Sequence, residues 1–341
     1  MRRSRLILVP AIGLAAAAAL AACGSGSDDP AADGEINVLT AFYPLTFATE
    51  QVGGDHVAVT NLTPAGQEPH DLELSPSDIA AIEEADYVVY LKGFIPELDS
   101  AVEQYAADKS LDVLTAVETS EYDYTQAIEE EAHAEDEHAE EEHSEEATAT
   151  EDEHAEEEGH EHEELEGVDL HVWLDPIRYG QIGTAIGEGL AGVDDANKAD
   201  YTANAEAFNA DLTSLDAEFT DALASRTSDA IVTSHAAFGY LADRYGLTQI
   251  AISGLSPDQE PDSQHMAEVA EYVEANGITT IFFETLVSPD IADTLAAETG
   301  AQTAVLNPLE GLTAEQEDAG ADYFSVMREN LATLQTALGA A

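Results

Sequence analysis

The sequence contains one cysteine and few basic residues, with 10 Lys and Arg against 71 Asp and Glu and a formal net charge of −61 at pH 7. A single cysteine cannot form a disulfide within the chain, so the fold must be held by a hydrophobic core. A chain this acidic repels nucleic acid and anionic lipid headgroups and attracts cations. After the first 22 residues, no apolar run is long enough to span a bilayer.

Common catalytic motifs are also missing. A zinc hydrolase typically carries a helical His-Glu-x-x-His motif and keeps an open coordination position, and the sequence lacks this motif. It has neither a glycine-rich phosphate-binding loop nor the nucleophilic serine turn of an α/β-hydrolase. We therefore predict that the chain is not an enzyme.

The first 22 residues have the pattern of a secretory signal peptide, with three arginines before an apolar stretch rich in alanine. The stretch ends in Leu20-Ala21-Ala22-Cys23-Gly24, and small residues before a lone cysteine are typical of a lipoprotein signal. We expect Cys23 to be lipidated and residues 23–34 to form a flexible tether. The protein would then be extracytoplasmic and anchored to the cell membrane, in a periplasm or on the cell surface.

Two regions alternate short β-rich runs with helical patterns, which is typical of parallel α/β sheets. In the first, the β-rich runs are 36–40, 57–60 and 87–90, with a helix over 77–84. In the second, the β-rich runs are 230–233, 249–252, 280–283 and 304–306, with helices near 236–244, 262–275, 289–299 and 315–338. Between the regions, residues 195–226 lack Pro and Gly and repeat apolar residues at helical spacing, which predicts one long helix.

These patterns predict an α/β protein with two Rossmann-like lobes, each with a parallel sheet, joined by a long rigid helix. The predicted N-terminal lobe spans residues 35–194, the linking helix 195–227 and the C-terminal lobe 228–341. Two lobes joined in this way place a cleft between them. A helical connection also resists the wide hinge motion that a loop would allow.

Residues 125–166 interrupt the first lobe with a segment built mainly of Glu, His, Ala and Asp. Like charges at this density cannot collapse into a core, so we predict a disordered insertion. Its histidines are His133, His138, His143, His154, His160 and His162. They could gather Zn²⁺ weakly near the cleft, or the insertion could serve only to keep the protein soluble.

Five histidines lie outside the insertion, and three of them occupy loops suited to a binding site. His70 follows a turn-rich loop after the second β-rich run, His171 directly follows the insertion, and His235 follows the run 230–233. Open α/β sheets bind ligands beyond the carboxyl ends of their strands, where these loops should lie. We expect the other two, His56 and His265, to be structural.

The segments around these three histidines resemble the signatures of one family, the metal-binding lipoproteins of ABC importers. They are Glu68-Pro69-His70-Asp71-Leu72, His171-Val172-Trp173-Leu174-Asp175-Pro176 and Ser234-His235-Ala236-Ala237-Phe238-Gly239-Tyr240. Together with the insertion before the second motif, the resemblance covers nearly the whole mature chain. The segments 253–257 and 307–312 are similar to the zinc branch, the ZnuA and AdcA type.

The resemblance implies that His70 and His171 from the first lobe and His235 from the second bind a metal. The fourth ligand is expected from the loop after the last strand, with Glu310 as our choice. Asn307, Glu284 and a water molecule are alternatives. Three imidazoles and one carboxylate suit tetrahedral Zn²⁺, whereas Mn²⁺ favours oxygen-rich sites of higher coordination.

The function implied by the resemblance is high-affinity capture of Zn²⁺ outside the membrane and its delivery to the permease of an ABC zinc importer. The partners would be that permease and the membrane, through the lipid on Cys23, and the protein would be a monomer. Two alternatives remain. One is a Mn²⁺ or Fe²⁺ carrier of the same family, and the other is a surface metal buffer or adhesin without transport.

Overall fold

The computed structural model describes residues 35–121, 167–259 and 261–340. The predicted signal peptide, Cys23 and the tether lie outside the described residues. So does the predicted His-rich insertion over 125–166, with His133, His138, His143, His154, His160 and His162.

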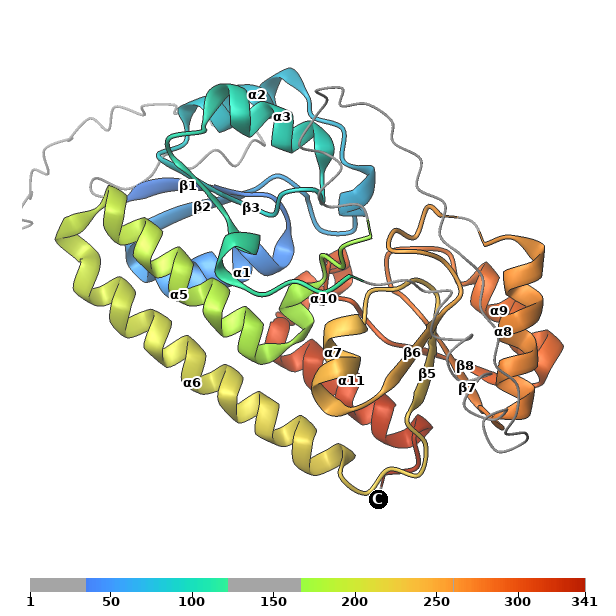
Figure 1. The fold of residues 1–341 in the computed structure, drawn as a ribbon. Helices are drawn as coiled ribbons and strands as arrows, with labels where there is room; N and C mark the ends of the chain where they lie inside the picture. Colours follow the sequence, from blue (N-terminus) through green and yellow to red (C-terminus); the bar gives the residue numbers. More distant parts are fainter. Residues whose placement is uncertain (1–34, 122–166, 260, 341) are drawn as a thin grey trace, which may run out of the picture.

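The first lobe is built on a four-stranded parallel sheet in the order β2-β1-β3-β4 (Figure 1). Its strands are β1 (Ile36–Thr40), β2 (Val57–Asn61), β3 (Tyr87–Tyr90) and β4 (Ser110–Asp112). Its helices are α1 (Tyr43–Gly53), α2 (Pro76–Glu84), α3 (Pro96–Tyr105) and α5 (Pro176–Val193). The sheet lies between two helical layers, with α2 and α3 on one face and α1 and α5 on the other.

The second lobe repeats this plan with a parallel sheet in the order β6-β5-β7-β8. Its strands are β5 (Ala230–Thr233), β6 (Thr248–Ala251), β7 (Thr280–Phe283) and β8 (Gln302–Val305). Its helices are α7 (Gly239–Tyr245), α8 (Ser263–Ala275), α9 (Asp290–Thr299), α10 (Ala314–Asp318) and α11 (Tyr323–Ala337). Helices α8 and α9 cover the outer face, and α7 and α11 lie on the side toward the first lobe (Figure 1). The predicted fold class, two α/β lobes with parallel sheets, is confirmed.

A long helix, α6 (Lys198–Leu223), runs along both lobes (Figure 1). It follows a short 3-10 turn, Asp195–Asn197, and therefore begins and ends slightly inside the predicted range 195–227. Its buried side chains recur at helical spacing and are Tyr201, Ala205, Phe208, Leu212, Leu215, Phe219 and Leu223. This apolar stripe fixes one face of α6 against the protein, while the opposite face stays polar.

Glycines on α5 allow it to approach α6 closely. Gly180, Gly183 and Gly187 recur at intervals of three and four residues and therefore lie on one face of the helix. A Cβ atom on Gly183 would lie 2.6 Å from Cδ1 of Phe208 on α6. The Phe208 ring is itself enclosed by the rings of Phe47, Tyr179 and Phe324, so it has little room to move.

Replacing Gly183 by alanine is expected to destabilise the protein by about 1–3 kcal/mol, the usual cost of overpacking a core. A control exists on the same helix, because a Cβ on Gly192 meets nothing within 4 Å. Gly192→Ala should stabilise the protein by about 0.5–1 kcal/mol through lower backbone entropy in the unfolded state. Urea unfolding of both variants measures the change in the free energy of unfolding. Equal changes for the two variants would show that close α5–α6 packing is not what requires a glycine at position 183.

The predicted helix over 315–338 is wrong as a single element, since the chain forms α10 and α11 instead. Gly320 has a φ of 74° and turns the chain between them. The Asp322 side chain then caps α11 in a reciprocal capping box with Ser325. The predicted helix at 236–244 begins later, at Gly239, because residues 234–238 form the loop that carries His235.

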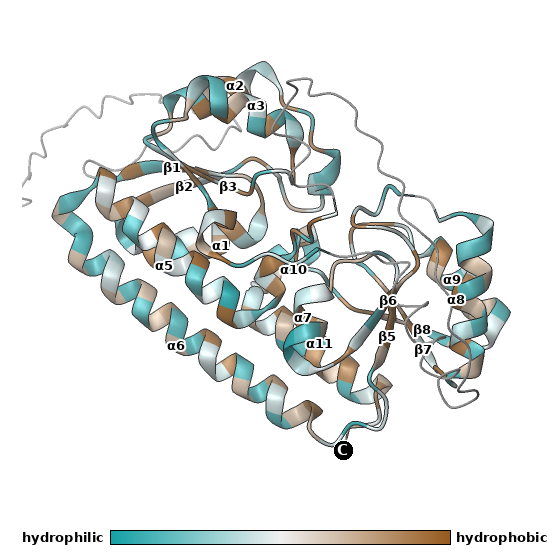
Figure 2. Cartoon of the chain, in the orientation of Figure 1, coloured by the Kyte–Doolittle hydropathy of each residue, from teal (hydrophilic) through white to brown (hydrophobic). Residues whose placement is uncertain are grey.

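The hydrophobic core is continuous across both lobes. One cluster joins β1 and β3 with α5, α6, α7 and α11, whereas a smaller cluster lies between the second sheet and helices α8 and α9. Figure 2 shows apolar residues concentrated on the strands, while α6 displays apolar and polar residues in turn along its length. Within the described ranges, no helix combines the length and apolar character needed to cross a membrane.

Candidate metal centre

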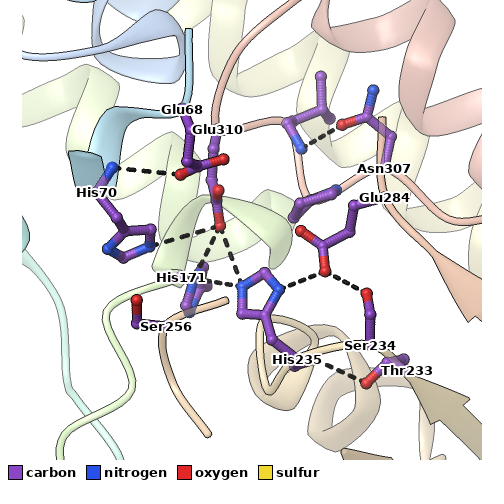
Figure 3. Close-up of polar contacts among 12 residues, drawn as sticks. Glu68, His70, His171, Thr233, Ser234, His235, Ser256, Glu284, Asn307 and Glu310 are labelled. Atoms are coloured by element: carbon purple, nitrogen blue, oxygen red, sulfur yellow. Dashed lines mark hydrogen bonds and ion pairs between the residues drawn. The ribbon is translucent and has the colours of Figure 1, made fainter. Parts of the chain in front are cut away.

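The structure brings His70, His171, His235 and Glu310 together between the lobes (Figure 3). One oxygen, Oε1 of Glu310, is the point on which the three rings converge. It lies 3.1 Å from Nε2 of His171, 3.2 Å from Nε2 of His235 and 3.8 Å from Nε2 of His70. The four candidate donor atoms all lie within 4.8 Å of one another, and all but His70 are fully buried.

Each of these side chains comes from a loop whose conformation the local sequence fixes. His70 lies in a 3-10 turn, Pro69–Asp71, where the Glu68 carboxylate accepts a hydrogen bond from the His70 backbone N–H at 3.2 Å. His171 precedes a second such turn, Val172–Leu174, which leads into α5. His235 follows β5 and Glu310 follows β8. His70, His235 and Glu310 thus lie beyond the carboxyl ends of strands, where open α/β sheets bind ligands.

Two buried carboxylates orient two of the imidazoles. Nδ1 of His171 donates to Asp169 at 2.8 Å, and Nδ1 of His235 donates to Glu284 at 2.5 Å. Glu284 also accepts a short hydrogen bond from the Ser234 hydroxyl. With Nδ1 occupied in this way, Nε2 of each ring is directed toward the shared centre. This role of Asp169 was not predicted from the sequence, although its position two residues before His171 was a visible signal.

Two of the alternatives for the fourth ligand have other contacts. Glu284 contacts the far nitrogen of His235 instead of joining the cluster. The side-chain oxygen of Asn307 accepts from the backbone N–H of Leu309 at 2.8 Å and so shapes the loop that carries Glu310. Leu309 has a φ of 60°, a left-handed conformation that costs a non-glycine residue about 1–2 kcal/mol. The loop is therefore held in a strained form that turns Glu310 toward the histidines.

The segment that carries His171 is bound to the second lobe at several points. The Trp173 indole N–H donates to the carbonyl of Pro308, in the Glu310 loop, at 2.7 Å. The Tyr323 hydroxyl on α11 donates to the Trp173 carbonyl at 2.7 Å, and the Tyr240 hydroxyl donates to the Asp169 carbonyl at 2.8 Å. These contacts fix the relative positions of the His171 and Glu310 loops.

The charged side chains of the site shift one another's pKa values. Burial alone would lower the pKa of His235, but Glu284 and Glu310 raise it well above its ordinary value. The pKa of His171 is likewise raised, because Asp169 and Glu310 outweigh the effect of burial. Burial would raise the pKa of Glu310, yet its contacts with the imidazoles of His171 and His235 hold that pKa well below its usual range. Burial, followed by the nearby charge of Glu310, raises the pKa of Glu68 to about 9.

The donor spacing fits a tetrahedral zinc ion. Bonds of about 2.0–2.1 Å place neighbouring tetrahedral donors roughly 3.3 Å apart. The separations to Glu310 are 3.1 and 3.2 Å for two histidines, and the Nε2 atoms of His171 and His235 are 3.4 Å apart. Two further atoms, His70 Nε2 and Glu310 Oε2, are buried without a hydrogen-bond partner among the described residues. A bound cation would satisfy such buried polar atoms.

His56 and His265, the two histidines predicted to be structural, lie outside this cluster. Nε2 of His56 is 3.0 Å from the Asp200 carboxylate at the surface, where the first lobe meets α6. His265 is buried in α8, and its Nε2 lies 2.9 Å from the carbonyl of Ala251. Neither belongs to the four-residue cluster.

Removing an orienting carboxylate is expected to weaken zinc binding by about 10- to 100-fold. Asp169→Asn and Glu284→Gln keep the shape of each side chain but remove the negative charge that holds the imidazole. Competition with a chromophoric chelator would measure the change. Asp216→Asn, at a carboxylate that binds Arg244 on the protein surface, is the matched control and should leave zinc affinity unchanged. Unchanged affinity in both site variants would show that the rings are oriented by packing alone.

Zinc binding is expected to release protons, because a ligating imidazole must be neutral and the surrounding carboxylates raise the pKa of both His171 and His235. These groups contribute stability that is fully present below their ordinary pKa of 6.5 and is lost as pH rises through the raised values. Because zinc competes with these protons, zinc affinity should increase with pH until the pH exceeds the raised pKa values of the two imidazoles. Calorimetry at one pH in two buffers of different ionisation enthalpy counts the protons, and identical binding heats would contradict the prediction.

Comparison with known proteins gives one consistent family. The family described as zinc-uptake complex component A periplasmic, ZnuA, matches residues 38–337. The chain is 38% identical over 325 residues to the zinc-binding lipoprotein AdcA of Streptococcus pneumoniae. The aligned segment covers 93% of this chain and 58% of AdcA. It is 35% identical over 331 residues to the high-affinity zinc uptake system protein ZnuA of Bacillus subtilis. That alignment covers 94% of this chain and 93% of the relative.

Solved structures show the same fold. Zn(II)-bound AdcA from Streptococcus pneumoniae has a TM-score of 0.68 and 34% identity, and the match covers 89% of this chain and 58% of AdcA. The laminin-binding protein Lmb of Streptococcus agalactiae, described as bifunctional with adhesin and metal transporting activity, has a TM-score of 0.69 and 28% identity. That match covers 89% of this chain and 99% of Lmb. The chain thus spans somewhat over half the length of the AdcA relatives that it matches.

Proposed function

Because this chain belongs to the family of the zinc-uptake complex component A, ZnuA, we propose that it captures Zn²⁺ outside the cytoplasmic membrane and delivers it to the permease of an ABC-type zinc importer. The observation that carries this proposal is the convergence of three imidazoles on one buried carboxylate oxygen. The names of its relatives support the same cargo, since both AdcA and ZnuA are named for zinc.

The proposed ligands are Nε2 of His70, His171 and His235 together with Oε1 of Glu310. Zinc is favoured because borderline-soft imidazole nitrogens suit it, whereas Mn²⁺ favours carboxylate, carbonyl and water oxygens. Four protein ligands would close the coordination sphere. Since a catalytic zinc site keeps one position open for water or substrate, this arrangement favours carriage of the ion over hydrolysis.

Two further inferences concern residues that the structure does not describe, and a third concerns the oligomeric state. We infer that Cys23 carries a lipid that keeps the protein at the membrane, near its permease. The histidines between residues 122 and 166 would bind Zn²⁺ weakly and raise its concentration near the site. We infer that the protein acts as a monomer, with the ion held between its own two lobes.

A second candidate function, surface adhesion, is favoured by one observation, the likeness to Lmb. The two functions are separable by experiment, because adhesion does not require a permease. A deletion strain that grows normally in zinc-depleted medium but no longer adheres would favour the adhesin. Growth failure that added zinc rescues would favour import, and rescue by manganese or iron instead would indicate a carrier for that metal.

The first test of the proposed cargo is competition calorimetry with Zn²⁺ and Mn²⁺ on the mature protein and on a variant lacking residues 129–164. We expect one tight Zn²⁺ site that survives the deletion, with only weak sites lost. Loss of all tight binding on deletion would place the main site in the insertion. A preference for Mn²⁺ over Zn²⁺ in the full chain would overturn the assignment of zinc as cargo.

A further inference from the structure

The ring of Phe94 contacts two of the four proposed ligands. Its centroid lies 4.1 Å from that of the His70 ring, with an interplanar angle of 38°, and 6.0 Å from that of the His171 ring, at 80°. Phe94 follows β3 at a turn where Gly93 has a φ of 89°, and only 3% of its surface is exposed. A close, tilted contact with one ligand ring and an edge contact with another place Phe94 beside the proposed site.

Two further aromatic rings hold Phe94 in place. Phe42 stacks on it with centroids 4.4 Å apart and an interplanar angle of 12°, and Trp173 meets its edge at 5.6 Å. Phe42, Phe94 and Trp173, which we call the aromatic wall, are all nearly fully buried. The single polar side-chain atom of the wall, Nε1 of Trp173, is bonded to Pro308. The aromatic wall therefore offers a metal no ligand and offers a water molecule no hydrogen-bond partner.

His70 depends on this wall more than the other histidines do. Asp169 and Glu284 fix the rings of His171 and His235 through their Nδ1 atoms. Among the residues that the structure describes, no carboxylate holds Nδ1 of His70, and its ring instead packs on the ring of Phe94 at a tilt of 38°. An imidazole gains positive character when it binds Zn²⁺, and the negative face of an aromatic ring attracts a positive charge. The contact should therefore strengthen when the metal binds.

We propose that Phe94 is a specificity-determining residue that holds His70 in place and keeps water off one side of the ion, so that four-coordinate Zn²⁺ is preferred over Mn²⁺. This inference rests on the proposed zinc site. Zinc is satisfied by four ligands, whereas Mn²⁺ favours six, mostly oxygen ligands, and would need water molecules to complete the set. The ring of Phe94 lies 4.1 Å from that of His70 and 6.0 Å from that of His171, so it borders the site there and offers such waters no hydrogen-bond partner.

The test compares Phe94→Ala, which opens space beside the site, with Phe94→Leu, which keeps apolar bulk but loses the planar face. The control is Phe219→Ala, because Phe219 is equally buried and stacks on Tyr245 at 5.0 Å, away from the site. Affinities for Zn²⁺ and Mn²⁺ are measured by competition. The visible absorption of bound Co²⁺ reports coordination number, since tetrahedral Co²⁺ absorbs more strongly than five- or six-coordinate Co²⁺.

We expect Phe94→Ala to lower Zn²⁺ affinity about tenfold or more, to lower Mn²⁺ affinity less, and to weaken the Co²⁺ absorption. Phe219→Ala should change none of these. Equal losses for both metals with an unchanged Co²⁺ spectrum would reduce Phe94 to a packing residue. If Phe94→Ala does not fold, Phe94→Leu takes its place. Its Co²⁺ spectrum and its ratio of Zn²⁺ to Mn²⁺ affinity are then compared with those of the unsubstituted protein, with the same outcomes supporting or refuting the proposal. Failure of the unsubstituted protein to bind zinc tightly would instead refute the proposed function itself.

Discussion

Replacing His235 by alanine is expected to lower zinc affinity by about 10²- to 10³-fold. Four-ligand zinc sites bind with roughly 10–16 kcal/mol, so one ligand contributes about 3–4 kcal/mol, and each 1.4 kcal/mol is tenfold. A large effect is expected because the His235 ring is fully buried and is fixed by Glu284, so no other group can readily take its place. Competition with a chelator of known affinity would measure the change.

Two further variants make this result interpretable. His235→Ala leaves the Glu284 carboxylate buried without its imidazole partner, which destabilises the fold. Combining it with Glu284→Gln removes that charge, so loss of zinc binding can be separated from loss of structure. His56→Ala removes a histidine that pairs with Asp200 at the surface and should leave zinc affinity unchanged. A folded His235→Ala protein that binds zinc within a few-fold of the parent would show that His235 is not a ligand.

Replacing Trp173 by alanine is expected to cost the metal-free protein about 3–5 kcal/mol of stability, the range for truncating a buried aromatic side chain. Trp173 is fully buried and packs against both Phe42 and Phe94. The substitution also leaves the Pro308 carbonyl without its donor, which adds to the cost. Urea unfolding followed by linear extrapolation would give the free energy of unfolding.

The same substitution should weaken zinc binding, because Trp173 connects the loops that carry His171 and Glu310. Trp173→Phe keeps most of the aromatic volume and loses the indole hydrogen bond, so it should fall between the parent and Trp173→Ala in stability. Tyr105→Ala, at an exposed ring on α3, should change stability by less than about 0.5 kcal/mol. A loss below about 1 kcal/mol for Trp173→Ala would show that the two loops are held together by other contacts.

Much of the fold was accessible from the sequence because the strands are short, apolar and bounded by polar residues. The runs 36–40, 87–90, 230–233 and 280–283 match β1, β3, β5 and β7 residue for residue. Strand β4 was missed, since its three residues are too few to show a pattern. The break between α10 and α11 was also missed, because it depends on the left-handed conformation of Gly320.

For the site, the sequence predicted the four side chains that the structure brings together, through loop position and resemblance. The residues that orient these four side chains could not be identified from the sequence. Glu284 lies 49 residues from His235 along the chain, and the Trp173 indole reaches Pro308 across 135 residues. The first pairing depends on how β5 and β7 lie side by side in the second sheet, and the second depends on how the two lobes dock. Short motifs encode neither arrangement. The ring contact between Phe94 and His70 is also hidden, because it joins the loops after β2 and β3 across the first lobe.

The hydrophobic cluster that crosses from one lobe to the other limits how this protein can evolve. Side chains from β1, α5, α6, α7 and α11 share that cluster, so neither lobe can be exchanged for a foreign one without refitting the other. The smaller cluster under α8 and α9 involves the second lobe alone. New loops, insertions or recognition surfaces would therefore be tolerated more readily on that outer layer, while the half of the molecule around the histidines must be inherited as a unit.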